Sequence, residues 1–323
     1  MLLTRTGHAF LATLTFCGAS AFAADTQLLN LVMPDAQVMA GINVTNAEIS
    51  PFGQFLLNKI TAGDQGLQDF VQQTGFDPTK DVSEILAASN GNHATPSGLV
   101  LAKGNFNVSQ FLSLIAADKN HQVSMYGAAT LITSTKASDN YAVAFLANSI
   151  AIAGDAASVK GAVDRGTGTT AISPALATQV QTLSTNNDAW SISIASLGAL
   201  IPGGTTSPSA NPVAVQTLQL VKNIQSANSG VKFGANVQCT AQAVADSPQN
   251  ASSLADVIKM VAGLAAMSAA GQNGQGAAIG QLIQSLQVTA TGATVNISAT
   301  VPENQIEAIL NASAEKPHVR KLR

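Results

Sequence analysis

The stretch VKFGANVQCTAQAV, residues 231–244, carries apolar side chains at its odd-numbered positions and mostly polar ones at its even-numbered positions. Successive side chains of a strand point to opposite faces of a sheet, so this period of two predicts one long strand with one buried face. Cys239 falls on the apolar face, which indicates a core residue with a slow thiol rather than a nucleophile. An apolar sheet face needs a cover, and we expect helices at 254–267 and 111–117 to supply it.

Other parts of the chain show related patterns. Two alternating runs within 286–301 flank Thr291-Gly292, which predicts a hairpin. Pro302 and Glu303 then begin a helix through residue 310, because proline fits a first turn and an acid there complements the helix dipole. The first half has its own set of expected elements: a strand at 97–103, a helix at 107–117 capped by Asn107, short strands within 121–152, and a helix through 163 capped by Asp155.

Residues 97–164 and 231–311 therefore share an order of strand, helix, antiparallel strands and helix. Each is preceded by a strand that follows an Asp-Ala pair, at 37–44 and 190–195. We predict an α+β protein of two tandem, divergent units of antiparallel sheet flanked by helices, that is, two sheets. The helical stretch 66–88 is expected as an insertion in the first unit, and any ligand groove is expected between the units. The predicted division is a signal peptide at 1–23, a first unit at 24–165, a linker at 166–174, a second unit at 175–314 and a basic tail at 315–323.

The first residues have the features of an export signal. Arg5 precedes an apolar run at 9–16, and Ala21-Phe22-Ala23 fits the small-x-small cleavage pattern, so we expect cleavage after Ala23. A lipoprotein signal with Cys17 as the lipidated residue is the alternative, although the bulky Phe16 before it departs from that pattern. Cleavage leaves Cys239 as the one cysteine, which rules out an intramolecular disulfide.

The composition excludes several classes of protein and of binding partner. The chain is 46% hydrophobic and 10% charged, which argues against intrinsic disorder. A net charge of −3 argues against a nucleic-acid partner, and the basic residues of 316–323 fit a solvated terminus. One Trp, two Tyr and eleven Phe disfavour carbohydrate-binding or base-stacking surfaces. The most apolar later segment, 257–270, is too short to span a membrane and is predicted to be a buried helix, so no transmembrane anchor is expected after signal cleavage.

The segment GFDPTKDVSEIL, residues 75–86, places three carboxylates at helical spacing. A metal or acid/base cluster is one interpretation, and helix capping is the other. Asp77 before Pro78 fits a helix start, and Asp81 with Glu84 fits a capping box, so two successive caps use all three acids. The alternating acids of a calcium loop are absent. We therefore predict no metal site here.

Other motifs point to no chemistry. The glycines of 166–171 and 274–280 follow predicted helices, which favours caps and linkers over nucleotide loops. No Gly-x-Ser-x-Gly elbow occurs, and His93, His121 and His318 have no zinc-ligand spacing. A pairing of Cys239 with a histidine stays open, because catalytic partners are often far apart in sequence. The sequence thus predicts no catalytic residue, cofactor or metal.

The pattern Gly75-Phe-Asp-Pro-x-x-Asp-Val82, with IAIAGD at 150–155 and a short helix downstream, resembles a pattern in uncharacterised exported bacterial proteins of duplicated α+β design. The resemblance implies export and architecture, and no activity. Our leading hypothesis is a soluble, non-enzymatic envelope protein of the periplasm or the cell exterior that binds another envelope protein or a small apolar ligand. The alternatives are a hydrolase with dispersed residues and an envelope factor anchored through Cys17. A pocket that joins His93 or His121 to Cys239, a serine or two acids would favour the enzyme.

Overall fold

The computed structural model describes residues 23–314 apart from 64, 116–118, 137, 167, 170, 201–218 and 270–274. The elements of the first half are α1 (Thr26–Leu31), β1 (Val38–Asn43), α2 (Val44–Ile49), α3 (Pro51–Gly63), α4 (Gln65–Thr74), β2 (Val82–Ser89), β3 (Gly98–Gly104), α5 (Val108–Ile115), β4 (His121–Tyr126), β5 (Ala129–Ser134), β6 (Tyr141–Leu146), β7 (Ile150–Asp155) and α6 (Ala156–Arg165). Those of the second half are α7 (Pro174–Asn186), β8 (Ala189–Ser193), α8 (Leu197–Leu200), β9 (Ile224–Lys232), β10 (Asn236–Ala245), α10 (Pro248–Ala269), α11 (Gln275–Ser285), β11 (Gln287–Thr291), β12 (Thr294–Pro302) and α12 (Glu303–Ala314).

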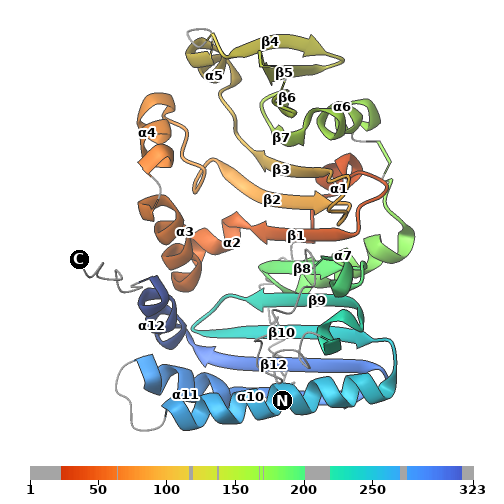
Figure 1. The fold of residues 1–323 in the computed structure, drawn as a ribbon. Coiled ribbons are helices and arrows are strands. Elements are labelled where there is room, and N and C mark those ends of the chain that lie inside the picture. The colour runs from red at the N-terminus through yellow and green to blue at the C-terminus, as the bar shows by residue number, and fades with distance from the viewer. Residues whose placement is uncertain are drawn as a thin grey trace, which may run out of the picture.

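All strands of the described residues belong to one sheet, in the order β11-β12-β10-β9-β8-β1-β2-β3-β7-β6-β5-β4 (Figure 1). Every neighbouring pair is antiparallel, and the predicted α+β class is confirmed. The expectation of two sheets is wrong, because β1 pairs with β8 and joins the halves. The joint includes Gly41 opposite Trp190, and the absent side chain of Gly41 leaves room for the indole ring.

The stretch 231–244 forms a hairpin rather than the single strand that its alternation predicts. β9 ends at Lys232 and β10 begins at Asn236, with Gly234 in the turn between them. The register pairs Lys232 with Gln238 and Val231 with Cys239, so even residues face even residues and odd face odd. An alternating pattern continues unbroken through a turn with this register, which is why the sequence conceals it.

Several local signals act as predicted. Gly292 takes a positive φ of 57° in the turn between β11 and β12. The Asn107 side chain accepts from the N–H of Gln110 at 3.2 Å and caps α5, and Asp155 accepts from Ser158 at 2.9 Å and caps α6. Gly166 ends α6 with a φ of 62°, as a glycine C-cap does.

The helix predicted over 66–88 is wrong in its second part. α4 ends at Thr74, and residues 82–89 form β2. β2 is an interior strand between β1 and β3, so Val82 and Leu86 enter the core from a strand and the sheet overrides the local capping signals.

The segment predicted to be a short buried helix at 257–270 is also different. Its residues 257–269 belong to α10, which begins at Pro248 and packs on the sheet through Ala251, Leu254 and Ala255, and residue 270 lies outside the described residues. Over Pro248–Ser268 the mean hydropathy is 1.3 and 17% of the window is buried, so its length and composition meet the criteria for a membrane-crossing helix. Core helices of soluble proteins and signal sequences meet the same criteria. Met260, Val261, Leu264 and Met267 are exposed.

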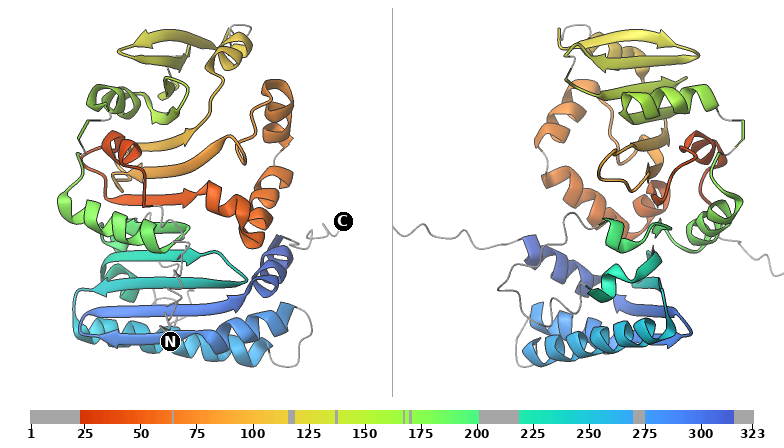
Figure 2. Two further views of the ribbon diagram at one scale, coloured as in Figure 1. Left: turned by 180° about the vertical axis from the view of Figure 1, so that it is seen from behind. Right: turned by 45° about the vertical axis from the view of Figure 1, so that its right-hand side comes forward.

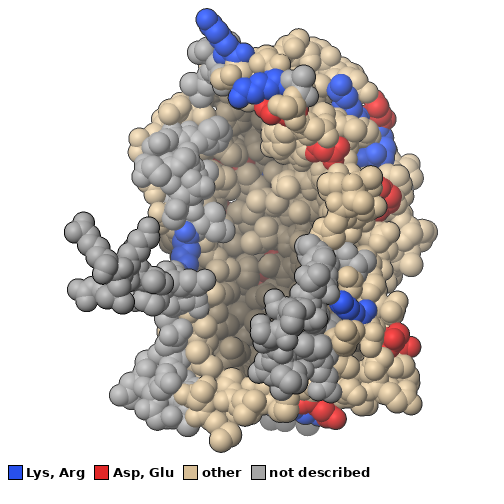
Figure 3. Space-filling model, viewed as in Figure 1, with Lys and Arg blue, Asp and Glu red and all other residues tan. Residues whose placement is uncertain are grey.

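Helices cover the sheet at its margins. α4, α3, α12 and α11 contact one another in that order and form a row along one side of the sheet (Figures 1 and 2). The face between this row and the opposite margin is hollowed along its middle, and the charged side chains lie mainly toward its edges (Figure 3). α5 packs on the sheet through Phe111, as the sequence predicts for a covering helix.

Candidate functional site

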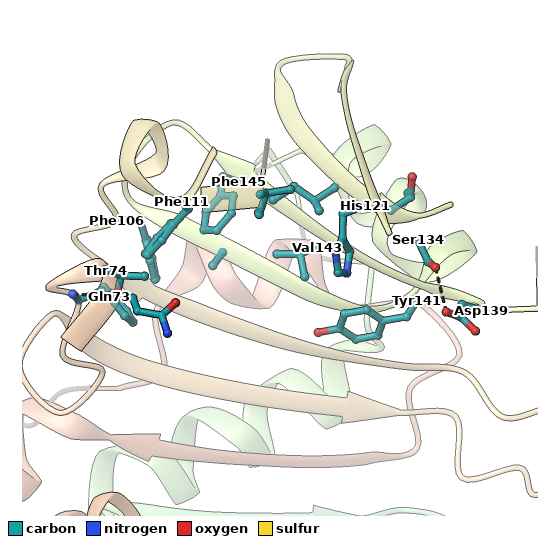
Figure 4. A pocket seen from close by; sticks show the side chains of 15 residues that line it. Gln73, Thr74, Phe106, Phe111, His121, Ser134, Asp139, Tyr141, Val143 and Phe145 are labelled. Atoms are coloured by element: carbon teal, nitrogen blue, oxygen red, sulfur yellow. Dashed lines mark hydrogen bonds between the residues drawn. The ribbon is translucent and has the colours of Figure 1, made fainter. Parts of the chain in front are cut away.

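A cavity of about 590 Å³ lies within the first half, between α5, the end of α4 and strands β4 to β7. Phe106, Phe111 and Phe145 mark one end, called the apolar end, although Gln73 and Thr74 also lie there, and His121, Ser134, Asp139 and Tyr141 mark the polar end (Figure 4). The lining residues are Gln73, Thr74, Phe76, Phe106, Phe111, Ile115, His121, Ile132, Thr133, Ser134, Asp139, Tyr141, Val143, Phe145 and Ala151. The sequence predicts a groove between the halves, and this cavity lies elsewhere, because the halves are joined there by continuous strand pairing.

Four phenylalanine rings form a closed circuit at the apolar end. Their centroids are 5.4 Å apart for Phe76 and Phe106, 5.8 Å for Phe106 and Phe145, 5.5 Å for Phe145 and Phe111, and 5.4 Å for Phe111 and Phe76. Phe106, Phe111 and Phe145 are each less than a tenth exposed. Each such aromatic pair adds about 0.5–1.5 kcal/mol of stability beyond that from buried area. These contacts hold the four rings together as the apolar base of the cavity.

Local structure fixes the position of these rings. α4 ends at Thr74, and Gly75 with a φ of 64° turns the chain so that Phe76 enters the cluster. The Asp77 N–H then donates to Asp81 Oδ2 at 2.7 Å, and Asp77 Oδ1 accepts from the Thr79 N–H at 3.0 Å. The two acids thus hold a tight turn directly after Phe76.

The polar end lies where β4, β5 and β6 meet the surface. His121 of β4 stands opposite Ser134 of β5, and the Ser134 hydroxyl donates to Asp139 Oδ2 at 2.8 Å. This hydrogen bond, with a second one from Ser138, lowers the pKa of the Asp139 carboxyl, so it is ionised at neutral pH. Tyr141 is 55% exposed, which places this end at the mouth of the cavity.

The prediction of two successive helix caps in residues 75–86 is wrong, because a turn leads directly into β2 and no helix begins there. Asp77 and Asp81 stabilise the turn described above, and Lys80 pairs with Asp77 at 2.9 Å. Glu84 instead lies on β2, where both of its oxygens accept from the Asp25 N–H at 3.1 Å. In the part of the chain that the structure describes, no group of three or more His, Cys, Asp or Glu could hold a metal ion.

The structure brings together only some of the residues that the sequence suggested for catalysis. His93 lies in the loop between β2 and β3, and Cys239 lies on β10 in the other half of the sheet from His121. Cys239 is half-buried rather than in the core that the strand pattern predicts, and this partial burial raises the pKa of its thiol. Cys17 and His318 lie outside the described residues, as do most of the predicted signal peptide and the predicted tail.

His121 does share its cavity with a serine and an acid, which the sequence does not reveal. Ser134 and Asp139 flank the turn between β5 and β6, and in the sequence they read only as turn residues. The phenylalanine circuit is hidden in the same way, because its members come from a loop after α4, a loop after β3, α5 and β6.

Comparison with known proteins yields structures rather than families. No family model matches the chain, and no curated protein matches its sequence. Crystal form III of TP0453 has a TM-score of 0.54 at 10% sequence identity, over 88% of this chain and 97% of that chain. Crystal form IV of TP0453 has a TM-score of 0.53 at 8% identity, over 87% of this chain and 95% of that one. At these identities the likeness concerns the fold alone, and it extends over both halves.

Proposed function

We propose that the protein is an exported, non-enzymatic binding protein that holds the chain of an amphiphile in the phenylalanine-lined cavity. The observation that carries this proposal is the closed circuit of Phe76, Phe106, Phe145 and Phe111 at the base of a cavity of about 590 Å³. Pockets for small ligands are typically 300–1,000 Å³ in volume, mostly apolar, and carry a few polar groups that fix orientation. Export rests on the predicted signal at 1–23.

The polar end favours a ligand head that donates hydrogen bonds. Asp139 is ionised, and the described residues that line the cavity include no lysine or arginine, although the nearby Lys136 acts on Asp139 from outside the lining. A hydroxyl or ammonium group would pair with the carboxylate of Asp139, whereas a carboxylate head would be repelled by it. The proposed ligand class is therefore a long-chain alcohol or amine, or a lipid whose head carries such a group.

Native mass spectrometry of protein from its own envelope tests retention of such a ligand. In vitro, displacement of a fluorescent long-chain amine measures affinity. Val143 lines the cavity, and Val143→Phe fills part of it, so we expect at least a tenfold loss of affinity. Ile49→Phe is the matched control, because Ile49 is 78% exposed on α2. Equal affinity in the two variants would refute the cavity as the site.

The head group is tested separately. Asp139→Asn removes the negative charge and keeps the size, so we expect weaker binding of the long-chain amine and tighter binding of the matching carboxylate. An unchanged preference between the amine and the carboxylate would show that the head group of the ligand does not contact Asp139. The mass of the mature N-terminus distinguishes the exported soluble form from one anchored through Cys17, which would carry the added mass of its lipid.

A hydrolase is the second candidate, and one observation favours it: His121, Ser134 and Asp139 line one cavity. A serine nucleophile requires a base at its hydroxyl. The Ser134 hydroxyl donates to Asp139 and accepts from the Lys136 N–H at 3.1 Å, which is the arrangement of a turn. Covalent labelling of the folded protein by a fluorophosphonate, lost in Ser134→Ala, would establish the enzyme and displace the binding proposal.

We also propose that the halves, 24–165 and 175–314, are copies of one unit. Support comes from the strand orders β1-β2-β3-β7-β6 and β8-β9-β10-β12-β11, which match position by position when β4 and β5 are set aside. α6 and α12 follow the matching strands β7 and β12. An experimental structure in which these five-strand sets fail to superpose would refute the duplication.

A further inference from the structure

A buried carboxylate stands beside the point where the predicted signal peptide ends. Glu84 lies on β2, and both of its oxygens accept from the Asp25 N–H at 3.1 Å. The preceding nitrogen, that of Ala24, donates to the Ser184 hydroxyl at 2.8 Å. Ala24 is 7% exposed, and Ala23, Ala24, Glu84 and Ser184 line one small cavity of about 10 Å³.

The residues directly after Ala24 in the chain set its position. Asp25 caps α1 by accepting from the Gln27 N–H at 2.8 Å, and its side chain also pairs with Lys103 of β3. Leu28 and Leu31 of α1 are fully buried in the main core. Removal of residues 1–23 therefore leaves Ala24 in place.

We propose that Glu84 and Ser184 form a binding site for the α-ammonium group that cleavage after Ala23 creates on Ala24. An amide nitrogen has one proton to donate, and an α-ammonium has three donors and a positive charge. One donor would keep the bond to Ser184 Oγ. Consecutive backbone nitrogens lie about 3–3.7 Å apart, and the Glu84 oxygens lie 3.1 Å from the Asp25 nitrogen, so the carboxylate is at most about 7 Å from the new charge and attracts it.

The charges around Glu84 fit this assignment. Asp25 and Lys103 face it and pair with each other. Asp188 lines the same cavity, and its carboxylate is bound by Lys232 at 2.8 Å and by the Phe233 N–H at 2.7 Å. Lys103 and Lys232 are therefore each paired with an acid other than Glu84. Burial, the largest cause, raises the pKa of the Glu84 carboxyl to about 7, although the charge of Lys103 acts to lower it.

The consequence is a junction that forms only after processing. Glu84 belongs to the first half and Ser184 to α7 of the second. An ammonium bound between them would link the halves beside Trp190, which lines the same cavity. The ligand is thus the chain's own N-terminus, and the site stays incomplete while residue 23 is attached.

The pH dependence of stability gives the test. With Ala24 as an amide, the folded chain keeps the Glu84 proton up to about pH 7, whereas the unfolded chain loses it near 4.5. The stability from this group is therefore full below about pH 4.5 and is lost as pH rises through about 7. An ammonium partner keeps Glu84 ionised when folded, so that loss disappears.

The experiment compares a chain that begins at Ala24 with one that carries Gly-Ser before Ala24, each with Glu84 and with Glu84→Gln. We expect the chain that begins at Ala24 to melt higher at pH 8, and the melting temperature of the extended chain to fall between pH 5 and 8. Glu84→Gln should abolish the difference. Identical profiles in both chains, or a difference that survives Glu84→Gln, would overturn the proposal.

A second readout does not depend on the stability of the variants. An amine-reactive reagent at neutral pH should label the Ala24 α-amine of the folded chain at least tenfold more slowly than after denaturation, and Ser184→Ala should speed the labelling. Labelling at the denatured rate would refute the site. N-terminal sequencing of the exported protein must begin at Ala24, and any other start would also refute it.

Discussion

The carboxylate of Asp188 accepts the backbone N–H of Phe233 at 2.7 Å. Asp188 precedes β8, and Phe233 lies in the turn between β9 and β10, so one side chain fixes the hairpin that the alternation conceals. The same carboxylate accepts from Asn46 of α2 at 2.7 Å and pairs with Lys232 at 2.8 Å. It is 3% exposed and links both halves.

We therefore predict that Asp188→Ala destabilises the protein by about 3 kcal/mol, because buried donors lose their acceptor. Lys232→Ala is the control: Lys232 is 46% exposed at its side chain and should contribute under about 1 kcal/mol. Urea unfolding measures both. Equal losses would mean that the ion pair, and not the buried hydrogen bonds, holds the turn.

Asp81→Ala should lower the unfolding free energy by about 1 kcal/mol, the usual effect of losing a local side chain–backbone bond. It should also weaken ligand binding, because the Asp77–Asp81 turn positions Phe76. Calorimetry with calcium and zinc is the complementary test. Tight, stoichiometric binding that disappears in Asp81→Ala would show a metal site instead.

Gly41→Ala tests the joint between the halves. A Cβ at Gly41 would lie 2.7 Å from the Trp190 ring, so the indole must move, and we expect a loss of about 2 kcal/mol. The chain has one tryptophan, so its fluorescence should shift with the same change. Gly263→Ala in α10 meets nothing within 4 Å and should stabilise slightly. If both changes have the same effect, the close approach at the joint carries no strain.

Cys239 should react slowly with a thiol reagent at neutral pH, because burial on β10 raises the pKa of its thiol. Its rate in the folded protein should be well below that of the unfolded chain. Fast labelling of folded protein would show that the strand register is wrong and would restore the nucleophile interpretation.

The sequence predicts features that depend on neighbours along the chain. The caps at Asn107 and Asp155, the turn at Gly292 and the helix that begins at Glu303 each follow from a few adjacent residues. A local sequence pattern is misleading where tertiary packing decides the secondary structure. Glu84 has a capping pattern, yet β2 is an interior strand, and the wider sheet outweighs a local cap.

The candidate site could not be predicted from the sequence, for a related reason. Phe76, Phe106, Phe111 and Phe145 are spread over 70 positions of the chain and share no period. Only the order of the sheet, which sets β7 beside β3 and β6 beside β7, brings them into one cluster. A pairing between β1 and β8 is equally non-local, so two predicted sheets became one.

The most direct test of the account is photo-crosslinking with a long-chain amine that carries a diazirine near the end of its chain. The proposal predicts adducts on cavity residues, above all Phe106, Phe111 and Phe145, and their loss in Val143→Phe. The exposed apolar side chains of α10, Met260, Leu264 and Met267, are the competing surface. Adducts confined to α10, with the cavity unlabelled, would show that the amphiphile binds α10 and not the cavity.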